Sequence, residues 1–296
     1  MLILFLLQCL LFCSQTGYAQ SKLEPRKFGN FKGCSEREVA ILREEMALAK
    51  QAATFAARYL TAYPYFWAFQ TPEHPFFQGK NFEQAASELF ARMAQSLEAG
   101  NFNIECHSDL CESFDDDDQP LASTDQPAPS QENRNPKAVM AFCEPFFDND
   151  SQKESYEAPT RRRLEQFRGN PEDNNVVNLA SLKSTKSQTI LHELSHTTFV
   201  GWPVLKILSQ AGRTDEWWMM SDWAYGPVDC YKLARGVFNH NQGTTPSEED
   251  LFRGAFRAAD NAESWGLIAI AMLFSNQLGN RQIPIPGIPN RAWGGN

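Results

Sequence analysis

Long apolar runs, an excess of basic residues and abundant histidine are all missing from this sequence of 296 residues. Beyond the N-terminus, no stretch approaches the about twenty apolar residues that cross a bilayer as a helix, so we expect no membrane partner. The formal net charge of −9 argues against binding to nucleic acid or to anionic membrane surfaces. With only five histidines in the chain, a regular spacing between two of them is informative.

The N-terminus carries the one marked apolar run, "MLILFLLQCLLF", which is followed by the small residues Gly17 and Ala19. The run is short for a helix that crosses a bilayer and is typical of a secretory signal peptide; a short membrane anchor is the alternative. We therefore predict a signal peptide over 1–19, a short segment over 20–33, and a secreted, extracellular protein. Removing the signal leaves five of the seven cysteines, enough for two disulfides and one thiol.

The rest of the chain mixes helical and strand patterns, and its length suits one large domain, which we place over 34–274, or two closely packed lobes. Ser35-Glu36-Arg37-Glu38 is a capping box that opens an alanine-rich helix ending before Pro64. A second amphipathic helix is predicted between Asn81 and Gly100. The stretches "FNIEC", "AVMAFCEPFF" and "NVVNLASL" predict strands.

Other segments predict loops and further helices. Residues 115–136 are acidic and rich in Pro, Ser and Gln, which predicts a mobile surface loop. Residues 158–168 predict a basic helix, and "AYGPVDCYKLARGVF" and "FRAADNAESWGLIAIAMLF" predict two later helices, the last one buried. The tail, residues 275–296, is predicted to be irregular.

The stretch "TILHELSH" places His192 and His196 four positions apart, with Glu193 directly after the first. On a helix the two histidines lie on one face and can bind one metal ion, while Glu193 reaches a water bound to that ion. Two neutral imidazoles and a general base are what zinc-dependent hydrolysis requires. The alternative is a surface helix with two unrelated histidines.

A catalytic zinc ion needs a third protein ligand. The metzincin pattern is excluded, because Phe199 and Trp202 stand where it requires Gly and His. Downstream, Asp222 is followed by Tyr225 and Gly226, so a carboxylate ligand and a hydroxyl donor for a developing oxyanion would come from one turn. The competing third ligands are Asp215, Asp229, His240 and Glu263.

HELSH followed by Asp-x-x-Tyr-Gly resembles the aspzincins, the deuterolysin and lysine-specific metalloendopeptidase family. The likeness extends to "FKGCSEREVAILREEMALAKQAATFAARYL", "AVMAFCEPFF" and "AADNAESW", and covers most of residues 30–274. It implies an α+β, zincin-like metallopeptidase fold with N-terminal helices, a small twisted sheet and an HExxH active-site helix. The chain departs from the family in lacking its Gly-Thr, since Met219 and Met220 precede Ser221, and in a longer connection between the HELSH helix and the aspartate.

The resemblance also assigns roles to residues. It implies one Zn²⁺ ion bound by His192, His196 and Asp222, Glu193 as general base, and Tyr225 as the group that stabilises the transition state. For the cysteines it implies Cys34–Cys106 and Cys111–Cys143, with Cys230 as a buried thiol. A local Cys106–Cys111 bond is the alternative.

Two further acids bear on specificity. Asp260 and Glu263 lie three apart on one predicted helix, so their carboxylates would share a face and line the pocket for the residue just after the cleaved bond. In lysine-specific members a similarly spaced pair does this, which implies a preference for Lys at P1′. The alternative is that Asp260 orders a loop and Glu263 is solvated.

The predicted function is a secreted, monomeric zinc endopeptidase acting on protein or peptide substrates. An edge strand within "AVMAFC" is predicted to pair with the extended substrate. The alternatives are a non-catalytic zinc-binding or zinc-scavenging surface protein on the same fold, and an adhesion module with a vestigial site. Glu193 and Tyr225 favour the enzyme, because a metal carrier needs neither.

Overall fold

The computed structural model describes residues 31–111, 120–128, 136–148, 158–183, 185–210, 219–238 and 245–289. The predicted signal peptide and nearly all of the segment 20–33 lie outside this described part. Within it, no helix combines the length and apolar character needed to cross a membrane.

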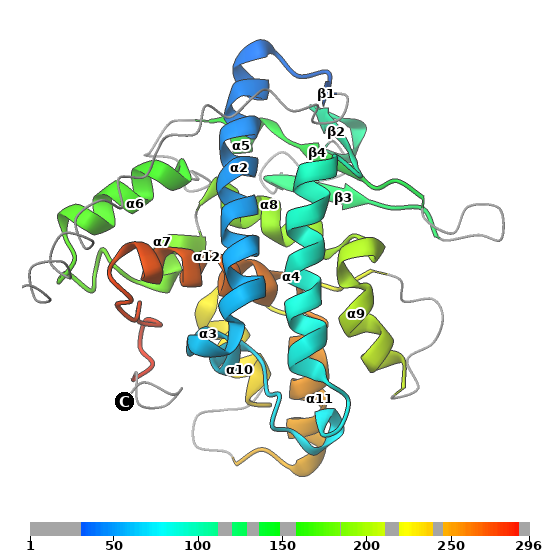
Figure 1. Ribbon diagram of the computed structural model, residues 1–296, viewed down its shortest axis with the longest axis vertical. Coiled ribbons are helices and arrows are strands. Elements are labelled where there is room, and N and C mark those ends of the chain that lie inside the picture. The colour runs from blue at the N-terminus through cyan, green and yellow to red at the C-terminus, as the bar shows by residue number, and fades with distance from the viewer. Residues whose placement is uncertain are drawn as a thin grey trace, which may run out of the picture.

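Two long helices, α2 (Glu36–Tyr59) and α4 (Phe82–Ala99), lie side by side and pack against each other (Figure 1). α2 begins at the predicted capping box, where the Ser35 hydroxyl accepts from the Glu38 N–H and the Glu38 carboxylate accepts from the Ser35 N–H. α4 ends at Gly100, whose φ of 64° is the left-handed conformation that favours glycine. Both helix predictions are confirmed. Between them lie the short helices η1 (Leu60–Ala62), α3 (Tyr65–Phe69) and η2 (Pro75–Phe77).

A four-stranded sheet in the order β1-β2-β4-β3 lies at one end of these helices (Figure 1). Strands β1 (Phe31–Lys32), β2 (Asn103–Cys106) and β4 (Val139–Phe142) are parallel, and β3 (Ala122–Asp125) runs antiparallel to β4. The strand predicted for "FNIEC" is confirmed. "AVMAFCEPFF" divides into β4 and the short helix α5 (Glu144–Phe147), because Pro145 in the first turn suits a helix start.

Two expectations about this sheet are wrong. β4 is an inner strand that is hydrogen-bonded on both sides, so "AVMAFC" offers no edge to a substrate. The edge beside the candidate site is β3, which lies inside the segment 115–136 that was predicted to be a mobile loop. The cause of the error is that β3 reads "ASTD" and consists of small and polar residues, so its strand structure comes from backbone pairing with β4 and not from a hydrophobic alternation.

Two disulfides join the sheet to its surroundings. Cys34 next to α2 is bonded to Cys106 at the end of β2, and Cys111 in the turn η3 (Asp109–Cys111) is bonded to Cys143 after β4. Both pairs are the ones that the family resemblance implied, and the local alternative is wrong. Cys230 is a buried free thiol, as expected.

The described residues from 158 onward are mostly helical. Their helices are α6 (Thr160–Gly169), α7 (Leu179–Lys183), α8 (Lys186–Ser195), α9 (Thr198–Ser209), α10 (Pro227–Ala234), α11 (Glu248–Ala259) and α12 (Ala262–Gln277). α8 carries HELSH, is buried along its whole length, and packs against α2 and α12. The described part of the tail, up to residue 289, has no helix or strand after α12, as predicted.

The strand predicted for "NVVNLASL" is wrong, because the chain forms a turn followed by α7. The Asn178 side chain accepts a hydrogen bond from the Ser181 N–H at 3.1 Å, which is the contact of a helix N-cap. A short apolar run fits a buried strand and a buried helix equally well, and here the cap decides.

The last predicted helix is interrupted. α11 ends at Ala259 and α12 begins at Ala262, with Asn261 in an extended conformation between them. The Asn261 side chain accepts from the Trp223 N–H at 2.9 Å and donates to the Ala224 carbonyl at 3.1 Å. These contacts compete with helix continuation and hold the segment before α10 beside α8. With its helices separate from one small sheet, the fold is α+β, as expected.

Candidate metal centre

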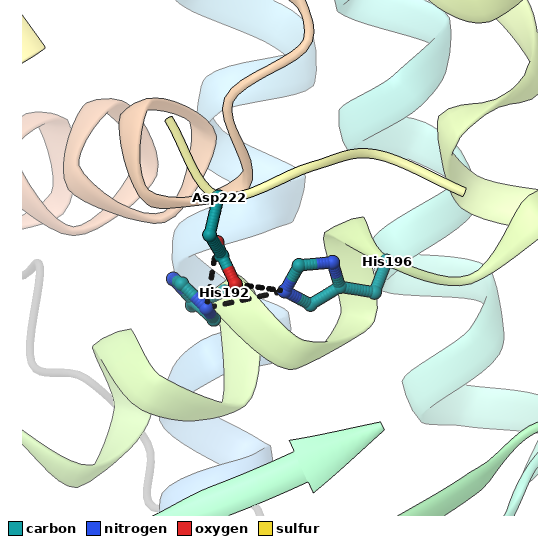
Figure 2. A group of neighbouring side chains, drawn as sticks. All are labelled: His192, His196 and Asp222. Carbon is teal, nitrogen blue, oxygen red and sulfur yellow. Dashed lines mark hydrogen bonds and ion pairs between the residues drawn. The ribbon is translucent and has the colours of Figure 1, made fainter. Parts of the chain in front are cut away.

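Three side chains converge on one point (Figure 2). His192 projects from α8, His196 is the residue that caps the C-terminus of α8, and Asp222 comes from the segment before α10. The Nε2 atoms of the two histidines are 3.2 Å apart; His192 Nε2 lies 3.3 Å from Asp222 Oδ1, and His196 Nε2 lies 3.3 Å from Asp222 Oδ2. Ligand atoms at about 2.0–2.1 Å from a tetrahedral zinc ion are separated by about 3.3–3.4 Å. The triangle formed by His192, His196 and Asp222 therefore has spacings close to those of zinc ligands, with a different carboxylate oxygen facing each imidazole.

Both imidazoles are oriented by a contact on the nitrogen that faces away from this point. His196 Nδ1 lies 2.8 Å from the Met220 carbonyl, which only accepts, so this Nδ1 carries the hydrogen. His192 Nδ1 lies 3.0 Å from a carboxylate oxygen of Glu263. Such contacts fix the tautomer and leave each Nε2 lone pair for a metal ion.

Without a metal ion, the histidines and the carboxylates of the cluster stabilise each other's charged forms. Burial lowers the pKa of His192, but the Asp222 and Glu263 carboxylates outweigh burial and raise that pKa well above its ordinary value. Burial raises the pKa of Asp222, yet hydrogen bonds from His192 and His196 bring it below its ordinary value. A metal ion at this point replaces protons that the histidines otherwise hold.

The competing third ligands do not join this group where the structure describes them. Glu263 contacts the opposite nitrogen of His192, and Asp229 is exposed on α10, 3.7 Å from Lys232 Nζ. Asp215 and His240 lie outside the described residues. Within the described ranges, the His192, His196 and Asp222 group is the cluster with metal-ligand geometry.

Glu193 lies beside the metal position without joining the triangle. Its Oε1 is 3.9 Å from His192 Nε2, and its Oε2 accepts a 2.8 Å hydrogen bond from the Thr124 hydroxyl on β3. Oε1 is thus the oxygen directed at the site, while Thr124 fixes the other. Thr124 was not predicted from the sequence, because it falls in the segment expected to be a loop.

Tyr225 forms part of the wall of the site. Its ring stacks on the His192 imidazole with centroids 5.9 Å apart, and the residue is 54% exposed. Burial and the nearby Asp222 carboxylate raise the pKa of the phenol above its ordinary value. The hydroxyl therefore stays protonated at neutral pH and can donate a hydrogen bond.

Asp260 and Glu263 do not share a helical face, because the chain breaks between α11 and α12. Asp260 is fully buried, and its Oδ2 accepts from Trp223 Nε1 at 2.9 Å. Glu263 is also buried, at 2% exposure, which contradicts the alternative of a solvated side chain. Its oxygens face three donors: Gln188 Nε2 at 2.7 Å, the Gly226 N–H at 3.0 Å, and His192 Nδ1.

A cavity of about 440 Å³ lies between β3 and α8 and is lined by His192, His196 and Asp222 themselves. Its walls include Thr124, Thr189, Tyr225 and Glu263, and Lys183 lines it from α7. The volume lies in the range of small-ligand sites, which suits one or two peptide side chains.

The chain was compared with family models, curated sequences and solved structures. No family model matches the chain, and no curated protein sequence matches it. Among solved structures, the fold is similar to a zinc peptidase from Grifola frondosa, with a TM-score of 0.42 and 14% identity over 80% of this chain and 96% of that chain. At this level of similarity, the function has to be argued from the geometry of the site.

Proposed function

We propose that this protein is a secreted zinc-dependent endopeptidase. The observation that carries the proposal is the triangle of His192, His196 and Asp222, whose spacing fits zinc, with the Glu193 carboxylate 3.9 Å from His192 Nε2. A site built only to bind zinc has no use for an oriented carboxylate beside the ion. Two disulfides support an oxidising, extracellular compartment.

Each group has a separate task in this proposal. A zinc ion held by His192, His196 and Asp222 would polarise the peptide carbonyl and lower the pKa of the attacking water. Glu193 Oε1 takes the proton of that water and passes it to the leaving amine. The Tyr225 hydroxyl donates to the carbonyl oxygen as it becomes negative.

β3 supports an extended substrate. One side of β3 is bonded to β4, and no strand among the described residues pairs with the other side. Thr124 on this strand contacts Glu193, so a peptide added to the free edge passes beside the general base. Pairing with the backbone of β3 would hold substrates largely independently of their side chains.

A preference for lysine is not included in the proposal and stays a prediction. Asp260 is fully buried and bonded to Trp223, and the oxygens of Glu263 face three donors. Asp260 does not line the cavity, and Glu263 lines it with oxygens that already accept hydrogen bonds from three donors.

Glu193→Gln tests the mechanism. The variant should bind zinc as the wild type does, because the three ligands are intact, and should lose turnover by about a hundredfold or more because the base is gone. Casein or quenched-peptide cleavage measures turnover, and elemental analysis measures zinc. Glu83→Gln, an exposed site on α4, is the matched control.

Two outcomes count against the proposal. Casein cleavage at the wild-type rate by the Glu193→Gln variant would show that the mechanism is wrong. A wild-type protein that binds zinc stoichiometrically and cleaves neither casein nor a diverse peptide library would favour the zinc-binding surface protein.

A further inference from the structure

Lys183, the last residue of α7, is the one lysine or arginine among the described residues that line the cavity. It is exposed, and no carboxylate in the described ranges forms an ion pair with it. It lies beside Gly226, where a Cβ atom would be 3.4 Å from Lys183 Cδ and 3.8 Å from Nζ. Gly226 directly follows Tyr225, so the Lys183 ammonium group lies beside the residue next to Tyr225, the proposed oxyanion donor.

The fold determines this position. Leu179 and Leu182 of α7 are fully buried and anchor the short helix, which leaves Lys183 directed along the surface. Gly226 has a φ of +76°, which favours glycine, and its missing side chain lets the aliphatic stem of Lys183 lie over the backbone.

The acids of the cavity are engaged with other partners. Asp222 contacts the two histidines, and Glu193 Oε2 accepts from Thr124. The Glu263 oxygens face Gln188, His192 and Gly226. Among the residues that the structure describes, no carboxylate of the cavity is paired with the Lys183 ammonium, and an arriving carboxylate can supply a partner.

We propose that Lys183 selects substrates with a carboxylate at a residue next to the cleaved bond. The inference rests on the proposed peptidase function and names the substrate class of the same site. The carboxylate is an aspartate or glutamate side chain, or the C-terminal carboxylate of a short peptide. Because Tyr225 donates to the carbonyl of the cleaved bond, a group one residue along the wall is within reach of the flanking residues.

The size of the effect follows from the exposure of Lys183. Ion pairs at exposed sites are weak, so we expect acidic peptides to be preferred by about two- to fivefold over their amide analogues. Salt screens exposed pairs, so the preference should shrink as ionic strength rises.

The test is cleavage-site profiling of the full-length zinc-loaded protein. Matched peptides carry Asp or Glu, Asn or Gln, or Lys next to the cleaved bond, each as a free C-terminal acid and as an amide. The wild type should prefer Asp and Glu. Lys183→Gln should lose that preference and Lys183→Glu should turn it toward Lys, while Lys206→Ala on the exposed face of α9 leaves it unchanged.

A second measurement is independent of turnover. In the Glu193→Gln background, binding of the same fluorescently labelled peptides should show the same acidic preference, and Lys183→Gln should remove it. Melting temperatures of all variants confirm that each is folded. A preference restricted to free C-terminal acids identifies the terminal carboxylate as the group recognised, whereas one that persists in the amides identifies the side chain.

The outcomes separate the inference from the proposed function. Efficient cleavage with a flat or lysine-rich profile overturns the role of Lys183 and leaves the peptidase intact. An equal fall in kcat for all peptides in Lys183→Gln also overturns it, because the residue would then act on the reaction itself. Absence of cleavage in every peptide, with no acidic preference in binding, overturns both.

Discussion

Replacing Glu263 by glutamine tests whether this buried acid serves the metal site. In the structure its carboxylate faces His192 Nδ1, Gln188 Nε2 and the Gly226 N–H, all within 3.0 Å. Glutamine keeps one acceptor oxygen and turns an NH₂ group toward at least one of these donors. His192 then loses its anionic partner, and its orientation and basicity as a ligand both suffer.

The expected magnitude follows from comparable partners of metal ligands. Their loss typically weakens metal affinity by about 10- to 100-fold, which corresponds to about 1.4–2.7 kcal/mol. Glu263→Ala is a poorer test, because it leaves three buried donors without an acceptor at about 1–3 kcal/mol each and risks unfolding the protein. Glutamine keeps the volume and part of the hydrogen bonding.

Zinc affinity is measured by competition with a chelating dye, and melting temperature in excess chelator measures the stability of the metal-free fold. Asp229→Asn, an exposed site on α10, is the matched control and should bind zinc as the wild type does. A zinc affinity within twofold of wild type in the Glu263→Gln variant would refute the reasoning. If that variant also lost a lysine preference, Glu263 would belong to the substrate pocket.

Two further predictions concern Thr124 and Glu45. Thr124→Val should lower kcat by about tenfold with KM and zinc content unchanged, because the Glu193 carboxylate loses the hydrogen bond that holds its orientation. The control Thr54→Val, at an exposed position on α2, should have no effect in the same peptide assay. Burial raises the pKa of Glu45 in the folded protein above the ordinary 4.5, even though the Ser187 hydroxyl donates to its carboxylate. The protonated Glu45 side chain therefore stabilises the fold at low pH, and this contribution is lost as the pH rises through the folded-state pKa. Melting temperature should therefore fall less between about pH 4.5 and pH 7 in Glu45→Gln than in wild type; equal falls would contradict this.

His192, Glu193 and His196 could be placed from the sequence because their geometry is local. A helix turns about 100° per residue, so a spacing of four puts both imidazoles on one face wherever the helix lies in the fold. Asp222 is different, because no periodicity links it to α8. It was predicted from the family resemblance, and the structure brings it to the two histidines.

β3 and Thr124 could not be predicted, for a physical reason. A strand of small and polar residues has no hydrophobic alternation, and it is held by backbone pairing with β4 and by the contact of Thr124 with Glu193, both distant in the sequence. The residues around β3 have the composition of a loop. Composition indicates which residues are buried, but it does not indicate which backbone segments pair in a sheet. The same limit made "NVVNLASL" ambiguous, since a short apolar run is compatible with both helix and strand.

The interruption between α11 and α12 explains how distant parts of the sequence form one site. The Ser221 N–H donates to the Asp260 carbonyl at 2.9 Å, and the Ala262 N–H donates to the Ser221 carbonyl at 3.0 Å. Asp222 is thus held next to a residue that is bonded on both sides of the helix break. Glu263 lies two residues after Asn261, and its carboxylate orients the His192 imidazole. The helix break therefore positions both Asp222 and His192. An unbroken helix, which the apolar pattern predicted, would have left this segment without its backbone partners.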